Sequence, residues 1–94
     1  MTETSLNSFF VYIVKCHDGT YYTGFAHNVE NRVARHNTGR GAKYTRSRTP
    51  VELVYAKQFP TYLQAVREEA RIKKLTRRQK EEIINTRIEG LMEE

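Results

Sequence analysis

Five residues of this chain carry side chains suited to chemistry on a phosphate ester. They offer two phenols, a phosphate-binding cation, an imidazole and a carboxylate, and they are Tyr12, Tyr22, Arg32, His36 and Glu69. One carboxylate is too few for a two-metal site. It is enough for one Mg²⁺ ion, or another divalent cation, because Mg²⁺ keeps most of its waters and takes one or two protein oxygens plus the substrate phosphate. The set predicts phosphodiester cleavage, and it contains no Ser/His/Asp or Cys/His arrangement.

The turn between the first two strands decides whether Tyr12 and Tyr22 can act together. Side chains alternate between the faces of a sheet, so a two-residue loop would put the two phenols on opposite faces. A three-residue loop at 17–19 pairs Tyr12 with Gly24 and puts both tyrosines on one face. We favour this loop, because Gly19 then becomes the left-handed residue of a bulged turn. Gly24 is then expected to leave room for a ligand to approach the backbone.

A first helix at 28–37 carries the arginine and the histidine. At about 100° per residue, Val29 and Val33 define its apolar stripe, His36 falls inside the stripe and Arg32 lies on its edge. Arg35 is expected to point well away. Arg32 and His36 then share a face turned toward the sheet. Each has a purely structural alternative. Arg32 could simply cover the edge of the core, and His36 could be a partly buried histidine whose hydrogen bonds are satisfied within the fold.

A second helix at 61–75 places a glutamate among apolar residues. On the same angular count Glu69 and Lys73 lie in the middle of the apolar stripe, and Glu68 lies well outside it. That stripe consists of Tyr62, Ala65, Val66, Ala70 and Ile72. A glutamate there is costly unless it is paired, hydrogen-bonded or bound to a metal. The alternative to a metal ligand is a partly buried ion pair between Glu69 and Lys73.

The elements that position these residues follow the order ββαβαα. Thr61 and Thr76 each begin a capping box, with a glutamine three residues later. We expect an α+β fold, a three-stranded, mostly antiparallel sheet flanked by helices, since a small bare sheet is marginal. The strands are predicted at 9–16, 20–25 and 51–59, the helices at 28–37, 61–75 and 76–88, and a loop at 38–50. The predicted domain spans 9–86, between an N-terminal tail at 1–8 and a frayed C-terminal tail at 87–94.

Basic residues gather in two runs. The chain has 16 Lys and Arg against 11 Asp and Glu, a net charge of +5. Residues 39–48 hold four basic residues and residues 71–80 hold six, and neither run contains an acid. Such runs suit a polyanion such as nucleic acid, although a solvated surface with uneven charge is the alternative. The candidate nucleic-acid contacts are Arg40, Lys43, Tyr44, Arg46, Arg48, Lys73, Lys74, Arg77 and Arg78.

The length and composition exclude several classes of protein. With 94 residues the chain forms one small domain, and its lone cysteine, Cys16, allows no internal disulfide and no zinc spacing. The N-terminus does not read as a signal peptide, and the apolar run at 9–14 is far too short for a bilayer. We therefore expect a soluble, cytoplasmic protein with no membrane contact.

These residues also resemble the GIY-YIG nuclease superfamily. The segment "FVY" at 10–12 stands in place of GIY, "YTG" at 22–24 stands in place of YIG, and the family arginine and glutamate match Arg32 and Glu69. The resemblance covers about residues 9–86. The run "RHNTGRGAKYTRSRTP" followed by "LVYAKQF" is similar to a subgroup of small, single-domain bacterial GIY-YIG proteins of poorly defined cellular role.

The resemblance implies metal-dependent hydrolysis of nucleic acid, DNA above all, in DNA repair or processing. Glu69 would hold Mg²⁺, and Tyr22, or a group acting through it, would help to remove a proton from the attacking water. Arg32 would stabilise the charge that builds on the phosphate. Tyr12 and His36 would orient water or phosphate, with His36 a second candidate base.

Two other functions remain open from the sequence. One is a nucleic-acid-binding module that keeps the fold without cleaving. The other is an interaction domain whose basic face meets an acidic protein. We expect no appended DNA-selecting domain, so a protein partner for targeting is a further option.

Overall fold

The computed structural model describes residues 9–92, and the side chains of residues 9–86. Strands β1 (Phe9–Lys15), β2 (Tyr21–Ala26) and β3 (Glu52–Phe59) form one antiparallel sheet in the order β2-β1-β3. The helices are α1 (Val29–Asn37), α2 (Lys43–Arg46), α3 (Tyr62–Lys73) and α4 (Arg77–Met92). The fold is α+β, and the ββαβαα order is confirmed apart from α2, which lies inside the predicted loop at 38–50. α4 runs to Met92, past the predicted end at residue 88.

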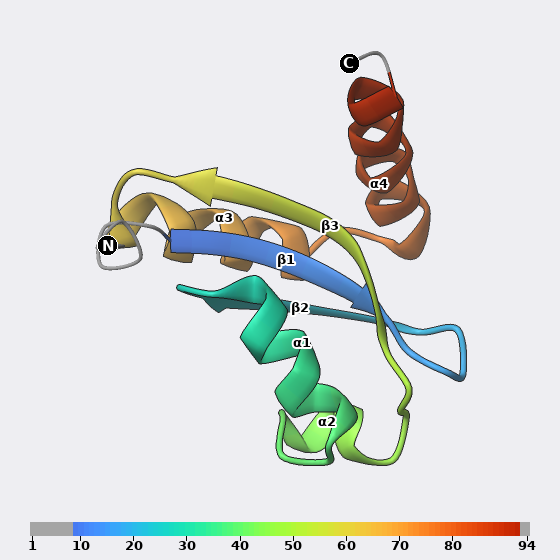
Figure 1. Cartoon of the computed structure of the whole chain (residues 1–94). Coiled ribbons are helices and arrows are strands. Elements are labelled where there is room, and N and C mark those ends of the chain that lie inside the picture. Colours follow the sequence, from blue (N-terminus) through green and yellow to red (C-terminus); the bar gives the residue numbers. More distant parts are fainter. Residues whose placement is uncertain (1–8, 93–94) are drawn as a thin grey trace.

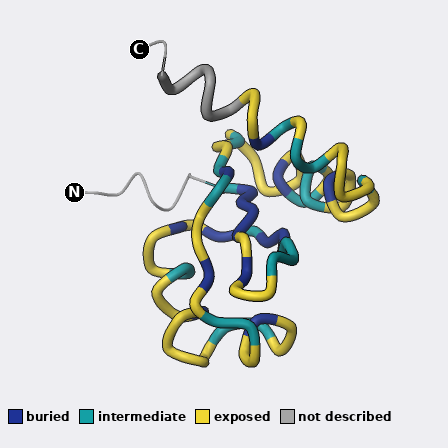
Figure 2. The backbone as a smooth tube through the Cα atoms, turned by 90° about the vertical axis from the view of Figure 1, so that its right-hand side faces the viewer, coloured by how far each residue is buried: buried dark blue, intermediate teal, exposed yellow. Residues whose placement is uncertain are grey.

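The central position of β1 follows from its sequence, which is apolar on both faces. Val11, Ile13 and the β3 residue Tyr55 pack against Ala65 and Ile72 of α3 on one face. Tyr12, Val14, Val29 and Val51 pack together on the opposite face, where α1 lies. The sheet is therefore covered by a helix on each side, with β2 at one edge and β3 at the other (Figure 1). Figure 2 shows the buried residues gathered along the strands in the middle of the molecule.

The helix ends match the polar residues that cap them. Asn28 Oδ1 accepts from the Asn31 N–H at 2.9 Å at the start of α1. Thr61 Oγ1 accepts from the Gln64 N–H at 3.2 Å, and Thr76 and Gln79 form a reciprocal capping box ahead of α4. The predicted N-termini of the three longer helices are therefore confirmed.

Residues 37–51 form a closed segment below the sheet. The Asn37 amide group donates to the Val51 carbonyl at 3.1 Å and accepts from the Val51 N–H at 2.6 Å. One side chain thus binds both backbone groups of a residue fourteen positions away, as a neighbouring strand would. This clasp fixes the end of α1 to the beginning of β3, with α2 between them.

Candidate active site

The hairpin register puts the two tyrosines on one face of the sheet, as predicted. Tyr12 pairs with Gly24 and Val14 pairs with Tyr22. The Cys16 N–H donates to the Thr20 carbonyl at 2.7 Å, so residues 17–19 form a three-residue turn, and Gly19 has a φ of +88°. Tyr12 is almost fully buried, while Tyr22 is half-buried. The sequence therefore predicted the relation between the two phenols correctly.

A chain of hydrogen bonds links Tyr12 to the segment that follows α1. The Tyr12 hydroxyl oxygen lies 2.9 Å from Nε2 of His36, and Nδ1 of His36 lies 2.8 Å from Oγ1 of Thr45. The Thr45 hydroxyl donates its proton to the Ala42 carbonyl at 2.9 Å, so its oxygen must accept from Nδ1 of His36. A neutral His36 then has a free lone pair at Nε2, and Tyr12 donates its proton there.

The surroundings of this pair set the charge of both groups. Burial, followed by the nearby Arg32 and Arg35 guanidinium groups, lowers the pKa of His36 below its usual 6.5 and favours the neutral ring. Burial and, after it, the Tyr22 phenol raise the pKa of Tyr12, while the Arg32 guanidinium lowers it, and the net pKa is about 12. Tyr12 is therefore a neutral phenol whose proton already points at a neutral imidazole.

Two glycines allow these side chains to approach the backbone. A Cβ on Gly24 would lie 2.5 Å from the Tyr12 hydroxyl oxygen, because the phenol ring crosses directly over this residue. The expectation that Gly24 leaves room for a ligand is therefore wrong, since Tyr12 itself fills that space. A Cβ on Gly41 would lie 2.8 Å from Cα of His36, so Gly41 lets the segment after α1 close on the histidine.

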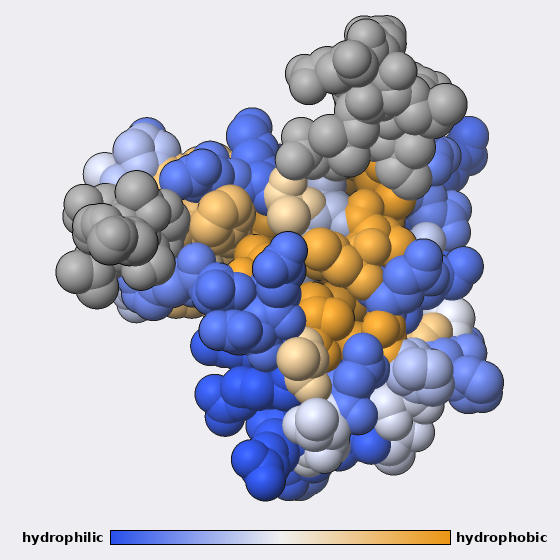
Figure 3. Space-filling model, in the orientation of Figure 1, coloured by the Kyte–Doolittle hydropathy of each residue, from blue (hydrophilic) through white to orange (hydrophobic). Residues whose placement is uncertain are grey.

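The Arg32 pocket is a cavity of about 280 Å³ on the α1 side of the sheet. Four of the five predicted site residues line it, and the full lining is Tyr12, Tyr22, Arg32, Arg35, His36, Arg40, Gly41 and Ala42. Nη1 of Arg32 donates to the Phe25 carbonyl at 3.3 Å, which holds the guanidinium beside the pocket. Figure 3 shows strongly hydrophilic residues gathered over α1, the element that supplies two arginines to the pocket.

The prediction that Arg35 points well away needs correction. Arg35 is exposed and lies off the apolar stripe of α1, but its side chain still lines the Arg32 pocket. The pocket opens at the edge of the stripe, where a long arginine side chain can reach it. The angular count gives the direction in which a side chain leaves the helix, and it takes no account of how far a long side chain reaches.

Glu69 lies beside this pocket rather than among its lining residues. Its carboxylate binds the Lys73 ammonium at 3.2 Å, and its side chain is 21% exposed. Its charge contributes to the raised pKa of Tyr12. Lys73, its partner, lines a hollow beside β2, so the ion pair lies on the β2 side of α3. The ion-pair alternative for Glu69 is thus present, and the structure brings together four of the five predicted residues with the fifth close by.

The prediction that Glu68 lies well outside the stripe is wrong. Its side chain is 18% exposed, as sheltered as that of Glu69, and it forms hydrogen bonds of 2.9 and 2.6 Å with the Arg71 guanidinium. The hydrogen bond and the charge of Arg71 lower the pKa of Glu68, and the Lys57 ammonium of β3 lowers it a little more. Ala65 and Ile72 form the true centre of the stripe, so the prediction that Glu69 and Lys73 lie in its middle is also wrong. Arg71, the partner of Glu68, lies beside β3 and Lys73, the partner of Glu69, lies beside β2, so the two glutamates flank the stripe toward opposite edges of the sheet.

The donor set allows a test of the implied metal. No group of three or more His, Cys, Asp and Glu residues converges within residues 9–86, where side chains are described. Glu69 therefore offers a single carboxylate. This fits a Mg²⁺ ion that keeps its waters and is completed by a substrate phosphate, and it does not fit a cage built from protein alone.

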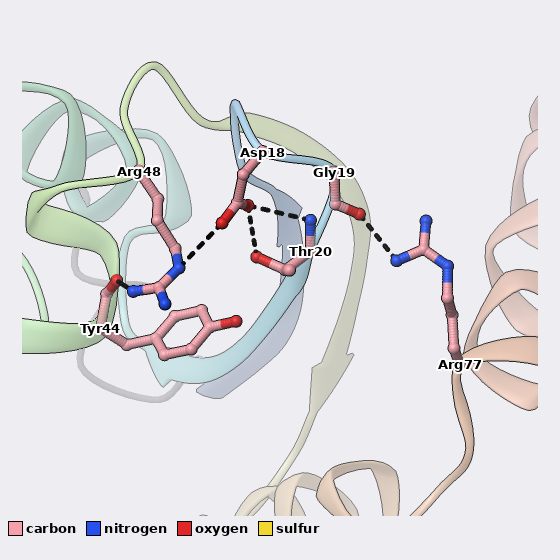
Figure 4. A network of polar contacts seen from close by, with 6 residues as sticks. All are labelled: Asp18, Gly19, Thr20, Tyr44, Arg48 and Arg77. Carbon is pink, nitrogen blue, oxygen red and sulfur yellow. Dashed lines mark hydrogen bonds and ion pairs between the residues drawn. The ribbon is translucent and has the colours of Figure 1, made fainter.

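Several of the predicted nucleic-acid contacts already bind groups within the chain. Nε of Arg48 lies 3.0 Å from Asp18 Oδ2, and Arg48 also donates to the Tyr44 carbonyl at 2.6 Å (Figure 4). Arg77 donates to the Gly19 carbonyl at 2.8 Å from the opposite side of the same turn (Figure 4). The two arginines clamp the hairpin turn, so their charges are partly committed to the fold.

The Tyr44 ring connects the basic run at 39–48 to the site. It stacks on Tyr22 with centroids 6.0 Å apart, and Tyr22 in turn packs edge-on against His36 at 5.4 Å. Sequence reasoning missed the site residues Thr45 and Gly41. The only available signal was a small hydroxyl residue and a glycine in the segment just after His36.

The comparisons with known proteins place this fold in a domain family. The GIY-YIG catalytic domain family matches residues 8–82, and the chain belongs to this family. It is 56% identical over 71 residues to a UPF0213 protein of Halobacterium salinarum, covering 76% of this chain and 92% of that one. It is 52% identical over 79 residues to a UPF0213 protein of Staphylococcus epidermidis, covering 84% and 96%.

The fold has solved counterparts. The solution structure of a UPF0213 protein from Bacillus halodurans matches with a TM-score of 0.56 at 43% identity, covering 84% of each chain. A solution structure of a protein from E. faecalis matches with a TM-score of 0.59 at 42% identity over the same shares. Across the described residues, no helix has the length and hydropathy to cross a membrane.

Proposed function

We propose that this protein is a divalent-metal-dependent endonuclease that hydrolyses phosphodiester bonds of DNA, acting in DNA repair or processing. The family supports nuclease chemistry. The observation that carries the proposal is the buried hydrogen bond from Tyr12 to His36 at the wall of a pocket that also holds three arginines. A proton acceptor and a phosphate-binding surface thus meet at one place, as hydrolysis of a phosphodiester requires.

The residues divide the chemistry between proton transfer and charge stabilisation. The Tyr12 oxygen can accept a proton from the attacking water while its own proton passes to Nε2 of His36, so the phenol relays the proton without having to ionise. Tyr22 is a second phenol within reach of the same pocket. Arg32 binds the phosphate oxygens as negative charge builds on them. Mg²⁺ held by Glu69 would add Lewis-acid stabilisation of the phosphate and the leaving oxygen.

The second candidate is a nucleic-acid-binding module without cleavage activity. The ion pair between Glu69 and Lys73 favours it, because a carboxylate neutralised by a lysine is less available to a metal. Binding without cleavage would leave the basic segments as the functional part.

Cleavage by matched glutamate variants distinguishes the two candidates. Glu69→Gln should lower the cleavage rate of a labelled duplex, branched or single-stranded substrate in Mg²⁺ on the order of 100-fold or more, because the amide loses the metal. DNA affinity without Mg²⁺ should change little, since the basic segments stay intact. The matched control is Glu68→Gln, at a side chain that is 18% exposed against 21% for Glu69 and that faces the other edge of the sheet.

Glutamine keeps one hydrogen-bonding oxygen toward Arg71, so the control should fold and cleave like the wild type. Equal cleavage by both variants would show that Glu69 does not bind the metal. Binding with no cleavage by the wild type on any of the three substrates would favour the binding module.

A further inference from the structure

A second hollow lies at the free edge of the sheet. It has a volume of about 250 Å³ and is lined by Tyr21, Tyr22, Thr23, Tyr44, Lys73 and Lys80. Because side chains alternate along β2, Tyr21 and Thr23 lie on the α3 side of the sheet and Tyr22 lies on the α1 side. This β2-edge pocket therefore wraps around the edge strand. Tyr22 also lines the Arg32 pocket, so the two pockets adjoin.

Arginines hold two of its three tyrosine rings in place. The Arg48 guanidinium carbon lies 4.0 Å from the centroid of the Tyr44 ring, and that of Arg77 lies 4.8 Å from the centroid of Tyr21. Figure 4 shows Arg48 lying over Tyr44 while it is bound to Asp18 of the hairpin turn. The aromatic walls are thus fixed before any ligand arrives, which reduces the entropy lost on binding.

The floor of the pocket contains an unsatisfied polar atom. Thr23 is 3% exposed, and its hydroxyl oxygen is the one buried side-chain N or O atom without a hydrogen-bond partner among the described residues. Buried polar groups are normally paired, so this hydroxyl offers an open hydrogen-bonding position to a polar group of a ligand. Lys80 supplies positive charge at the same place, beside Lys73, whose charge is shared with Glu69.

We propose that the β2-edge pocket binds one unpaired nucleobase of the strand whose phosphate occupies the Arg32 pocket. This inference rests on the proposed function, which supplies nucleic acid as the ligand. The volume lies below the roughly 300–1,000 Å³ of sites for drug-sized ligands, so the pocket accepts a single base. Every base has a π-face that can stack on tyrosine, while the lysines contact the backbone.

The proposal narrows the substrate class. A base inside a duplex cannot enter a side pocket unless it leaves the stack. The preferred substrate is therefore single-stranded nucleic acid, or a strand that is locally unpaired next to the scissile phosphate.

Binding to strands with and without bases tests the proposal. Fluorescence anisotropy in EDTA, where a metal-dependent enzyme cannot cleave, would compare labelled oligothymidine with an oligomer of equal length made of abasic residues. The wild type should bind the thymidine strand tighter by about tenfold or more, because stacking is lost with the base while the phosphates stay. It should also bind this strand tighter than a duplex of the same length.

Variants of the exposed Tyr44 test whether the preference for the thymidine strand arises in the β2-edge pocket. Tyr44→Leu should bind the two strands alike, and Tyr44→Phe should keep the preference, because only the ring is needed. The control is Tyr62→Leu, the same change at a tyrosine that is 59% exposed on α3 and outside the pocket, and it should behave like the wild type.

Wild-type binding that is equal for thymidine and abasic strands would overturn the proposal without any variant, and so would equal affinity for the duplex. These outcomes are independent of cleavage. A protein that cuts DNA with no preference for bases would refute this inference alone. A protein that prefers the thymidine strand and never cuts would refute the nuclease proposal alone.

Discussion

Hydrogen bonds occupy both ring nitrogens of His36. Thr45 fixes its Nδ1 as a donor, and Tyr12 occupies its Nε2. Protonation of the ring would leave two donors facing each other between the imidazole and the Tyr12 phenol, unless that phenol turns. The histidine therefore stabilises the fold in its neutral form.

This constraint predicts a loss of stability in mild acid. The pKa of His36 is lowered in the folded state, so the unfolded chain binds the proton first as the pH falls. The contribution of the neutral ring is complete above the unfolded pKa of about 6.5 and is lost as the pH falls through the lower folded value. Urea unfolding between pH 8 and pH 5 would measure this fall.

The change His36→Gln should flatten this part of the profile, whereas His17→Gln, at an exposed histidine, should keep it. A profile that is equally steep in the His36 variant would assign the acid sensitivity to other groups.

At the scale of the elements, the β1–β2 hairpin needs a glycine at position 24, where any Cβ would collide with the Tyr12 ring. Gly24→Ala would place a methyl group 2.5 Å from the Tyr12 hydroxyl oxygen and 2.6 Å from the adjoining ring carbon. The ring would have to shift and lose its bond to His36, so we expect cleavage to fall more than tenfold and the unfolding free energy to drop by about 1–3 kcal/mol. Single-turnover cleavage and urea unfolding would measure the two effects. Wild-type activity in this variant would show that the position of Tyr12 is not needed.

The hairpin also shows how far the sequence predicts this molecule. A turn length and the alternation along two strands were enough to place Tyr12 and Tyr22 on one face, and polar caps were enough to begin three helices. These features are set by neighbours in the sequence. The ring of Tyr12 filling the space over Gly24, and Glu68 binding Arg71, depend on side-chain packing that no periodicity encodes. α2 was missed because a four-residue helix has too short a pattern to detect.

At the scale of the whole molecule, the basic residues behind the net charge of +5 differ in whether they are bound within the fold. Arg46 is exposed and has no ion pair within the residues that the structure describes, whereas Arg48 binds Asp18 and stacks on Tyr44. Counting basic residues in a run therefore overestimates the charge that is free to meet a polyanion.

The two arginines should respond differently to the same substitution. Arg46→Gln should weaken DNA binding and reduce the slope of log affinity against log salt by about one, since each neutralised phosphate releases counterions. The same variant should unfold at the wild-type urea concentration. Arg48→Gln should instead lower the unfolding free energy by roughly 1 kcal/mol, an amount kept small because the ion pair is partly exposed.

Anisotropy over a salt series and urea unfolding would separate these effects. Affinity of the wild type that does not change with salt would contradict nucleic-acid binding through the basic segments.

The clasp between Asn37 and Val51 has a consequence for chain connectivity. It joins both ends of the segment that contains Gly41, Thr45 and the Tyr44 ring, so this segment is a ring closed by two hydrogen bonds. A protease cut within residues 38–50 would open the covalent chain but leave both new ends attached to the rest of the molecule. The two fragments should therefore copurify under native conditions and separate in urea, as the halves of a noncovalent complex do.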